Sequence, residues 1–302
     1  TYGKKRFFSN IEISTDKKSF WKACKPYLSS KSSNSNEKIT LLENRQTVSD
    51  ESTLAGIFNS YFINVTKSLN ITYWKGPSLY TNDPVLKAIV KYNTHPSILA
   101  IKKIPNKSFE FSHVTPKIVH ENILKLKKGS LNTPLTVLKS VADVCTPYLT
   151  DCFNNSINNC SFPDEMKWAD ITPIHKKDDT TDKGNYRPIS NLPTISKVFE
   201  RIIYDQMYLF FDQLFSIYLG GFRKGFSVQH SLSRLLKIWQ QCLDKKGIVG
   251  TVLIDLSKAY DCIQHDLLIA KLAAYGFKRK SLSFIFSYLS NRKQRVKLGS
   301  IF

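Results

Sequence analysis

Residues 248–272 read IVGTVLIDLSKAYDCIQHDLLIAKL, and this stretch decides the fold. Its first seven residues are almost wholly apolar and end at Asp255, a pattern typical of a strand that is buried on both faces. Leu268 and Leu272 then recur at helical spacing. The stretch therefore predicts a central strand over 248–254 that is followed closely by a helix.

Strands and helices continue to alternate on either side of this stretch. Extended segments are predicted over 168–174 and 295–298, and a charged turn is predicted over 175–186. Apolar residues at helical spacing predict helices over 198–210 and 232–239. This interleaving indicates an α/β or α+β domain.

The amino-terminal third is organised differently. A short strand pair is predicted over 39–48, and apolar and aromatic residues at helical spacing predict a helix over 54–69. Ser49 or Asp50 would cap this helix, and its aromatic stripe is interpreted as buried packing. Residues 71–112 lack a clear period, so they are predicted to be a loop-rich connector with extended segments.

A boundary between two domains is predicted near residue 112. A helix is expected to begin after Thr115, because proline follows it. Residues 138–158 are predicted to be helical with an interruption at Pro147. We therefore divide the chain into an extension, 1–112, and a second domain, 113–302.

The composition indicates a folded, strongly basic protein. The chain has 302 residues, a hydrophobic fraction of 42% and a net charge of +20. So large an excess of positive charge favours a polyanionic partner, with nucleic acid first. A membrane surface and a merely solvated basic surface are the alternatives. No long apolar span predicts a crossing of the bilayer.

The cysteines argue against a disulfide or zinc framework. No two of them have the spacing of a zinc knuckle, and scattered single cysteines are typical of a reducing compartment. This amino terminus shows no signal peptide. The six positions are Cys24, Cys145, Cys152, Cys160, Cys242 and Cys262.

Asp255 is the sharpest chemical signal in the chain. A carboxylate at the end of a rigid strand suits a divalent metal ion, because Mg²⁺ prefers hard oxygen ligands in accurate geometry. The alternative from the pattern alone is an aspartate that caps a helix after the strand.

The residues around Asp255 favour the metal interpretation. The segment LIDLSKAYDCIQHDLLIAKL resembles the first palm motif of the reverse transcriptases of non-LTR retrotransposons, with Asp255, Tyr260, Asp261, His265 and Leu268 at the motif positions. Asp261 and His265 are interpreted as structural, as a turn contact and a helix-start contact.

Three further segments resemble this family in the expected order. The resemblance extends roughly over residues 115–302. Within the family, these residues are most similar to the jockey-like elements of arthropods. It implies the right-hand polymerase fold, with the fingers and the first part of the palm, preceded by a helical and loop-rich extension that joins endonuclease and polymerase. The matching segments are ITPIHKKDD with NYRPISNLPTISKVFERII, then GGFRKGFSVQHSL, and SYLSNRKQRVKL.

The resemblance implies an RNA-directed DNA polymerase. Such enzymes extend a DNA primer on a template RNA with deoxynucleoside triphosphates, and two Mg²⁺ ions align the reacting groups. It makes Asp255 a ligand of both metals and adds the backbone carbonyl of Leu256. Tyr260 falls where an aromatic ring lies under the sugar and excludes a 2′-hydroxyl; the alternative is a core aromatic.

Basic residues match the positions that bind the incoming nucleotide. Lys176 and Arg187 match the fingers residues that hold the triphosphate, and an arginine can bind two oxygens at once. Lys177 could exchange roles with Lys176. For Lys176 and Arg187, the alternative interpretation is a solvated residue on the surface. Arg223 and Lys224 are predicted to contact the template backbone.

Two departures from the family pattern stand out. The family usually carries a Gly-Pro-Asp-Gly turn where this chain reads GSLNTPLTVLK, which leaves template handling near residues 129–135 in doubt. His175 stands where proline is frequent.

Two alternative functions remain. One is a non-catalytic RNA- or DNA-binding protein derived from a retroelement. The other is a group II intron maturase, against which the jockey-like sequence of residues 255–272 argues. The resemblance implies an intracellular location, in nucleus and cytoplasm, which the sequence itself does not indicate.

Polymerase activity is predicted to be absent from these 302 residues alone. Thr1 and Phe302 look like cut ends, and the family's Pro-Gln-Gly block and aromatic-x-Asp-Asp motif do not occur in the sequence. One carboxylate cannot hold two metal ions. A primer-extension assay on the purified chain should show no incorporation of deoxynucleotides, and measurable incorporation would contradict the prediction.

Overall fold

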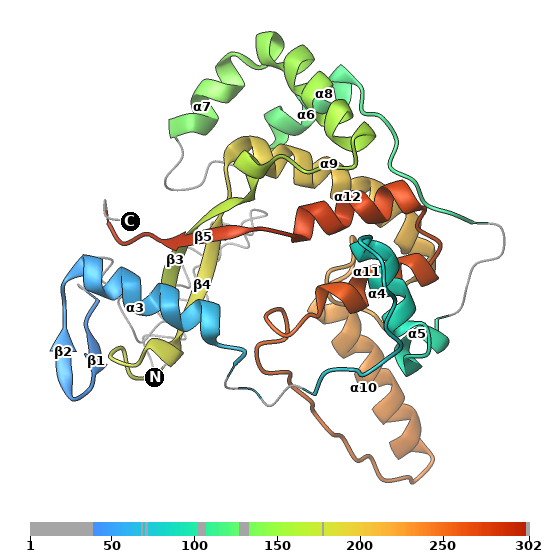
Figure 1. Ribbon diagram of the computed structural model, residues 1–302. Helices are drawn as coiled ribbons and strands as arrows, with labels where there is room; N and C mark the ends of the chain where they lie inside the picture. Colours follow the sequence, from blue (N-terminus) through green and yellow to red (C-terminus); the bar gives the residue numbers. More distant parts are fainter. Residues whose placement is uncertain are drawn as a thin grey trace, which may run out of the picture.

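The computed structural model describes residues 39–67, 69, 72–101, 107–126, 133–176 and 178–299. Figure 1 shows helices gathered around a small, twisted sheet. This mixture of helix and sheet confirms the mixed fold class at the level of its elements. None of the described helices is long and apolar enough to cross a membrane.

The described elements follow one another in two groups. The first group precedes the sheet and comprises β1 (Leu41–Glu43), β2 (Gln46–Val48), α3 (Glu51–Asn64), α4 (Pro84–Tyr92), α5 (Pro96–Leu99), α6 (Pro116–Lys125), α7 (Thr133–Ser140) and α8 (Ala142–Asn158). The second comprises β3 (Trp168–His175), β4 (Tyr186–Asn191), α9 (Thr194–Phe211), α10 (Val228–Asp244), α11 (His265–Ala274), α12 (Arg279–Leu289) and β5 (Lys293–Val296).

The central sheet has the strand order β4-β3-β5. β3 runs antiparallel to β4, with Ile174 opposite Arg187, and parallel to β5, with Asp170 opposite Arg295. Alternate residues of β3 are buried, with Ile171 only 2% exposed. One face of the sheet is therefore buried and the other is more open, because successive side chains of a strand point to opposite faces.

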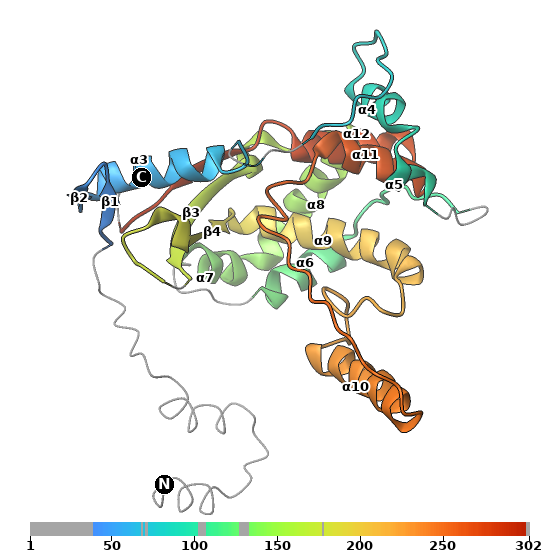
Figure 2. The same cartoon turned by 90° about the horizontal axis from the view of Figure 1, so that it is seen from below.

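Helix α3 covers the buried face of this sheet. Phe58 is fully buried, and its ring lies 4.9 Å from the ring of Tyr186 in an edge-on arrangement. Val296 from β5 joins the same apolar cluster. Figure 2 shows α3 along this side of the sheet, with α7 beyond the opposite side.

A second core holds the helices together. The rings of Phe153 on α8 and Phe199 on α9 stack with their centroids 4.3 Å apart, and the ring of Phe162 stacks on Phe199 from 5.4 Å. Phe284 of α12 meets Phe199 nearly at a right angle. Such aromatic contacts fix the positions of three helices around one point.

Most of the predicted elements are present. The predicted strands over 168–174 and 295–298 correspond to β3 and β5. Asp50 caps α3, because its carboxylate accepts a hydrogen bond from the backbone N–H of Thr53 at 2.8 Å. Phe58 and Phe62 of its aromatic stripe are buried, as predicted, while Tyr61 is half-buried.

Three predictions about secondary structure were wrong. Helix α8 runs through Pro147 without a break. The connector over 71–112 contains α4 and α5, each of which begins with a proline at its first turn. The predicted central strand over 248–254 does not form, and the segment has no regular secondary structure.

Residues 248–254 have no partner strand among the described residues, which explains why they do not form a strand. A strand buried on both faces needs neighbouring strands for its backbone hydrogen bonds and a layer of side chains on each face. The described sheets pair β1 with β2, and β3 with β4 and β5. The apolar residues are therefore left in solvent, with Ile248 95% and Leu253 91% exposed.

The two regions of the predicted boundary pack together. α3 contacts β5, and α4 contacts α11, with the hydroxyl of Tyr92 donating to Gln264 at 2.8 Å. These contacts do not test the boundary near residue 112, which stays a prediction. In both views α10 projects away from the rest, and none of its residues is buried.

Replacing Phe58 by alanine should destabilise the chain by about 3–5 kcal/mol, because it leaves a cavity between α3 and the sheet. Ile63→Ala on the same helix is the matched control, since that side chain is 55% exposed and its loss should cost less than about 1 kcal/mol. Urea unfolding measures both. Equal losses would show that α3 does not hold the sheet.

Candidate functional site

Lys176 and Arg187 lie on adjacent strands, on the same face of the sheet. The backbone N–H of Lys176 donates to the carbonyl of Asn185 at 2.8 Å, which continues the ladder one step beyond His175. Ile174 is opposite Arg187, so Arg187 and Lys176 are diagonal neighbours, with backbones about 7–8 Å apart. Both side chains are exposed.

The turn between these two residues is held from the buried side of the sheet. The hydroxyl of Tyr186 donates to the carbonyl of Thr180 at 2.7 Å, and Asp179 accepts from the backbone N–H of Thr181 at 2.8 Å. Burial, with a smaller effect of Asp179, raises the pKa of Tyr186 above its ordinary value. The turn therefore presents Lys176 and Arg187 from a fixed backbone.

The same open face carries further basic residues toward the other end of β3. In β5, Lys293 is opposite Trp168 and Arg295 is opposite Asp170. The Lys293 ammonium lies 5.1 Å from the centre of the Trp168 ring, and Arg295 donates to Asp170 at 2.7 Å. Lys293 and Arg295 alternate in β5 with Gln294 and Val296, which share the other face.

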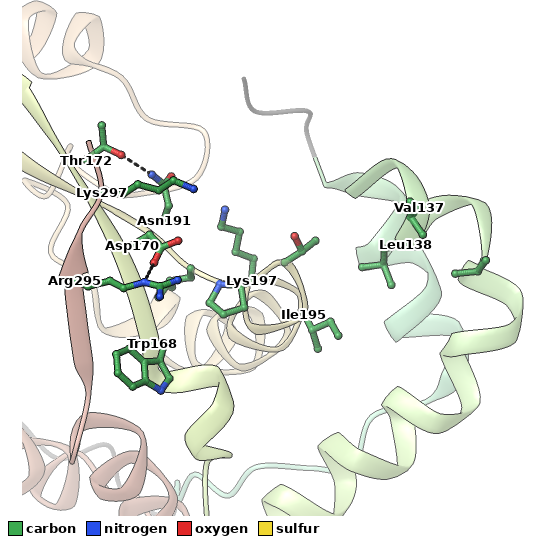
Figure 3. A pocket seen from close by; sticks show the side chains of 14 residues that line it. Val137, Leu138, Trp168, Asp170, Thr172, Asn191, Ile195, Lys197, Arg295 and Lys297 are labelled. Atoms are coloured by element: carbon green, nitrogen blue, oxygen red, sulfur yellow. Dashed lines mark hydrogen bonds and ion pairs between the residues drawn. The ribbon is translucent and has the colours of Figure 1, made fainter. Parts of the chain in front are cut away.

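This end of the face is the floor of a cleft of about 860 Å³. Figure 3 shows its walls, with Val137 and Leu138 of α7 facing the sheet across the opening and Lys197 of α9 between them. Lys297, just beyond β5, and Asn191 complete the floor near Thr172. The charged lining is three basic side chains, Lys197, Arg295 and Lys297, and one acidic side chain, Asp170.

Asp255 lies neither on a described strand nor in the lining of this cleft. Its side chain is exposed, and no described residue forms a hydrogen bond or an ion pair with it. Within the described residues, no three His, Cys, Asp or Glu side chains come together as a group for a metal ion. Asp255 and the carbonyl of Leu256 are hard oxygen donors, but they are two donors where Mg²⁺ takes six ligands.

Tyr260 is equally open, with 72% of the residue exposed. Its ring meets that of Phe222 at 90° and 6.3 Å, which links its turn to the glycine turn around residue 223. Lys258, two residues before Tyr260, lies over the ring of Tyr61 on α3, with its ammonium 5.6 Å from the ring centre. No described hydrogen bond, ion pair or ring contact joins Asp255 or Tyr260 to Lys176 or Arg187.

Arg223 and Lys224 make contacts within the protein. The Lys224 ammonium pairs with Asp205 at 2.8 Å and lies 4.5 Å from the centre of the Tyr208 ring. The Arg223 guanidinium stacks over Phe226 at 4.4 Å, and its Nε is 3.9 Å from Asp212. These contacts anchor the glycine turn to α9, a structural role that the sequence alone did not indicate.

A half-buried acid between α9 and α12, Glu200, was also missed from the sequence. The hydroxyl of Tyr288 donates to Glu200 at 3.0 Å, and Arg292 lies 3.7 Å from the same oxygen. Burial raises the pKa of Glu200 although Arg292 opposes it. Burial and the nearby Glu200 raise the pKa of Tyr288 to about 12.

Comparisons with known proteins identify the class of this domain. Residues 174–300 match the family described as "Reverse transcriptase (RNA-dependent DNA polymerase)". This range includes Lys176, Arg187, Asp255 and Tyr260. The matched region is therefore a reverse transcriptase domain.

The relatives in Drosophila melanogaster make the assignment narrower. The probable RNA-directed DNA polymerase from transposon BS is 31% identical over 58% of this chain and 20% of its own length. The RNA-directed DNA polymerase from mobile element jockey is 30% identical over 53% and 18%. The probable polymerase from transposon X-element is 28% identical over 65% and 22%. The chain is therefore similar to jockey-like, non-LTR reverse transcriptases, and it spans about a fifth of the length of these relatives.

The raised pKa of Glu200 gives a stability that depends on pH. The folded state holds the proton more tightly than the unfolded chain, so stability falls as pH rises from about 4.5 through the folded pKa. Glu200→Gln should flatten the decline of the unfolding midpoint between pH 4.5 and 7. The exposed Glu165→Gln is the control and should leave the decline unchanged. A parallel decline in E200Q and the parent would contradict the assignment.

Proposed function

We propose that this chain contributes the nucleotide-binding part of an RNA-directed DNA polymerase from a non-LTR retrotransposon. The observation that carries the proposal is the diagonal placement of Lys176 and Arg187, both exposed, at one end of the sheet. Two cations at that separation match a triphosphate, which needs dispersed positive charge. The family match over the same residues supports the polymerase interpretation.

In this proposal the two cations have different tasks. Arg187 would bind two phosphate oxygens through its planar fork, while Lys176 would act as a mobile point charge. The turn behind them would keep both side chains at the strand ends, because Tyr186 and Asp179 hold it by hydrogen bonds. Deoxynucleoside triphosphates would be the substrates, with template RNA and a DNA primer as partners.

Asp255 is proposed as the first metal-binding carboxylate, with the carbonyl of Leu256 as a neighbouring ligand. Bound Mg²⁺ would stabilise the charge that develops on the transferred phosphoryl group. Asp255 would then have to be fixed at the end of a formed strand, since an accurate ligand geometry needs a rigid backbone. The apolar residues 248–254 supply the side chains for such a strand once partner strands cover them.

Tyr260 is proposed to contact the sugar of the incoming nucleotide, and Arg223 and Lys224 the template backbone. Their contact with phosphates would compete with the ion pairs to Asp205 and Asp212. The right-hand arrangement of fingers and partial palm, the joining role of residues 1–112 and a location in nucleus and cytoplasm belong to the same proposal.

A second candidate function is favoured by one observation. The segment that carries Asp255 is solvated, while the basic face of the sheet is fully formed. A non-catalytic RNA- or DNA-binding protein derived from a retroelement would need only that face. Polymerase activity of the complete reading frame distinguishes the two candidates.

The decisive experiment replaces single residues in the complete reading frame that contains this chain. Asp255→Asn should reduce RNA-templated DNA synthesis by more than about 100-fold, since even outer partners of metal ligands contribute 10–100-fold. Arg187→Lys keeps the charge but loses the fork, so KM for deoxynucleotides should rise about tenfold. Lys117→Ala, an exposed lysine on α6, is the control. Full synthesis by the D255N protein would refute the proposed function.

A further inference from the structure

We infer that two tyrosines from residues 1–112, the predicted extension, position the turn over residues 256–264 and thereby set the discrimination between deoxyribose and ribose. The two are Tyr61 of α3 and Tyr92 of α4. The inference rests on the proposed function, because this turn carries Tyr260, the residue proposed to contact the sugar of the incoming nucleotide. It makes the extension a determinant of substrate specificity.

The turn over 256–264 has little packing of its own. No residue of the turn is buried, and a backbone hydrogen bond of 3.1 Å from the N–H of Cys262 to the carbonyl of Lys258 closes it. Lys258 has a φ of 51°, a left-handed conformation that residues with a side chain rarely adopt. The half-buried residues of the turn are Lys258, Cys262 and Gln264, and the first and last of these are the two that contact the extension.

The first contact holds the end of the turn. The hydroxyl of Tyr92 donates to the side-chain oxygen of Gln264 at 2.8 Å, and Tyr92 is only 1% exposed. A phenol hydroxyl at such a position needs a partner, because an unsatisfied buried donor is costly. Gln264 immediately precedes α11, which the fully buried Ile269 anchors in the helical core. The end of the turn is therefore tied to α4 as well as to α11.

Helix α4 is itself a firm support for this hydrogen bond. Val85 and Ala88 share the buried face of α4 with Tyr92 and belong to the core between the helices. Figure 1 shows α4 beside α11, and the two helices are in contact. At the other end of α4, Asp83 caps the helix and forms an ion pair with Arg279 of α12. Both ends of α4 are thus fixed on the second half of the chain.

The second contact holds the middle of the turn. The Lys258 ammonium lies 5.6 Å from the centre of the Tyr61 ring, close enough for the ring to attract the cation. Tyr61 is one helical turn beyond Phe58, which packs against Tyr186 in the sheet. Because Tyr186 directly precedes Arg187, helix α3 connects the turn with the strand that carries the proposed triphosphate site.

These two contacts matter because the ring of Tyr260 has little other support. Tyr260 is 72% exposed, and its described ring contact is with Phe222, which is 90% exposed. The backbone of the turn therefore decides where the ring lies. Ribose differs from deoxyribose by one hydroxyl group, so exclusion depends on how closely the ring approaches the sugar. Small displacements of a positioning group change rates steeply, and a loosened turn should admit ribonucleotides.

The first test compares a deoxynucleoside triphosphate with the matching ribonucleoside triphosphate in RNA-templated synthesis by the complete reading frame. Tyr92→Phe removes the hydroxyl, and Tyr61→Leu removes the aromatic face. Each should lower the ratio of kcat/KM for the deoxynucleotide to kcat/KM for the ribonucleotide by about two- to tenfold, the factor expected for the loss of one weak polar contact. A change that only weakens folding lowers both values together and leaves their ratio unchanged.

Matched variants separate the two contacts from a general effect of the extension. Tyr61→Phe keeps the ring over Lys258 and should retain the parent's ratio, although it loses a hydroxyl as Y92F does. Tyr80→Phe alters a fully exposed tyrosine of the extension and should also match the parent. Gln264→Met removes the acceptor, so Y92F/Q264M should lose no more of the ratio than Q264M alone, because both changes break one bond.

A second test needs no synthesis. Cys262 is half-buried in the turn, so the rate of its alkylation by N-ethylmaleimide reports how firmly the turn is held. On the full 302-residue chain, peptide mass spectrometry should show Cys262 reacting about two- to tenfold faster in Y92F and Y61L than in the parent. The exposed Cys152 is the internal reference and should react at one rate in all of them.

Two results would overturn the inference: a parental ratio in both Y92F and Y61L, or equal alkylation of Cys262 in parent and variants. Circular dichroism shows whether each variant is folded, and the half-buried Tyr61 carries both tests if Y92F does not fold. Failure of the proposed function has a different signature, which is full synthesis by D255N or a parental ratio in Tyr260→Ala. An unchanged ratio in Y92F and Y61L, with D255N inactive and Y260A accepting ribonucleotides, defeats this inference alone.

Discussion

The packing of α3 against one side of the central sheet is the contact on which the rest of the structure depends. Phe58 fills the space against Tyr186, and Ile171 and Val296 complete an apolar layer. Because side chains alternate along a strand, fixing this layer also fixes which residues face away from it. The opposite face is the one that carries the cations, so its chemistry follows from the burial of its reverse side.

The open face collects charge from three strands, of which β3 and β4 are close in sequence and β5 is distant. Lys176 and Arg187 come from neighbouring strand ends, and Arg295 comes from a strand more than one hundred residues later. Parallel pairing of β3 with β5 is what places Arg295 beside Asp170. Strand pairing therefore gathers part of the chain's net charge of +20 on one face of the sheet.

The segment around Asp255 shows what happens when the pairing is missing. Seven apolar residues have the pattern of a central strand, but a strand is not a local structure, since its hydrogen bonds are made with other segments. Helix α10 beside it likewise buries none of its residues. The apolar pattern of residues 248–254 and their exposure to solvent therefore both indicate that this segment needs partner strands to form a strand itself.

The sequence by itself predicted many of the local elements and the resemblance to the family. Asp50 and Thr115 begin helices because their side chains accept hydrogen bonds from nearby N–H groups, a short-range effect that can be read from neighbouring residues. Only the tertiary structure decided the long-range features: the cleft beside Trp168, the ion pair of Lys224 with Asp205, and the partial burial of Glu200. These depend on contacts between segments far apart in the chain, and no local pattern encodes such a distance.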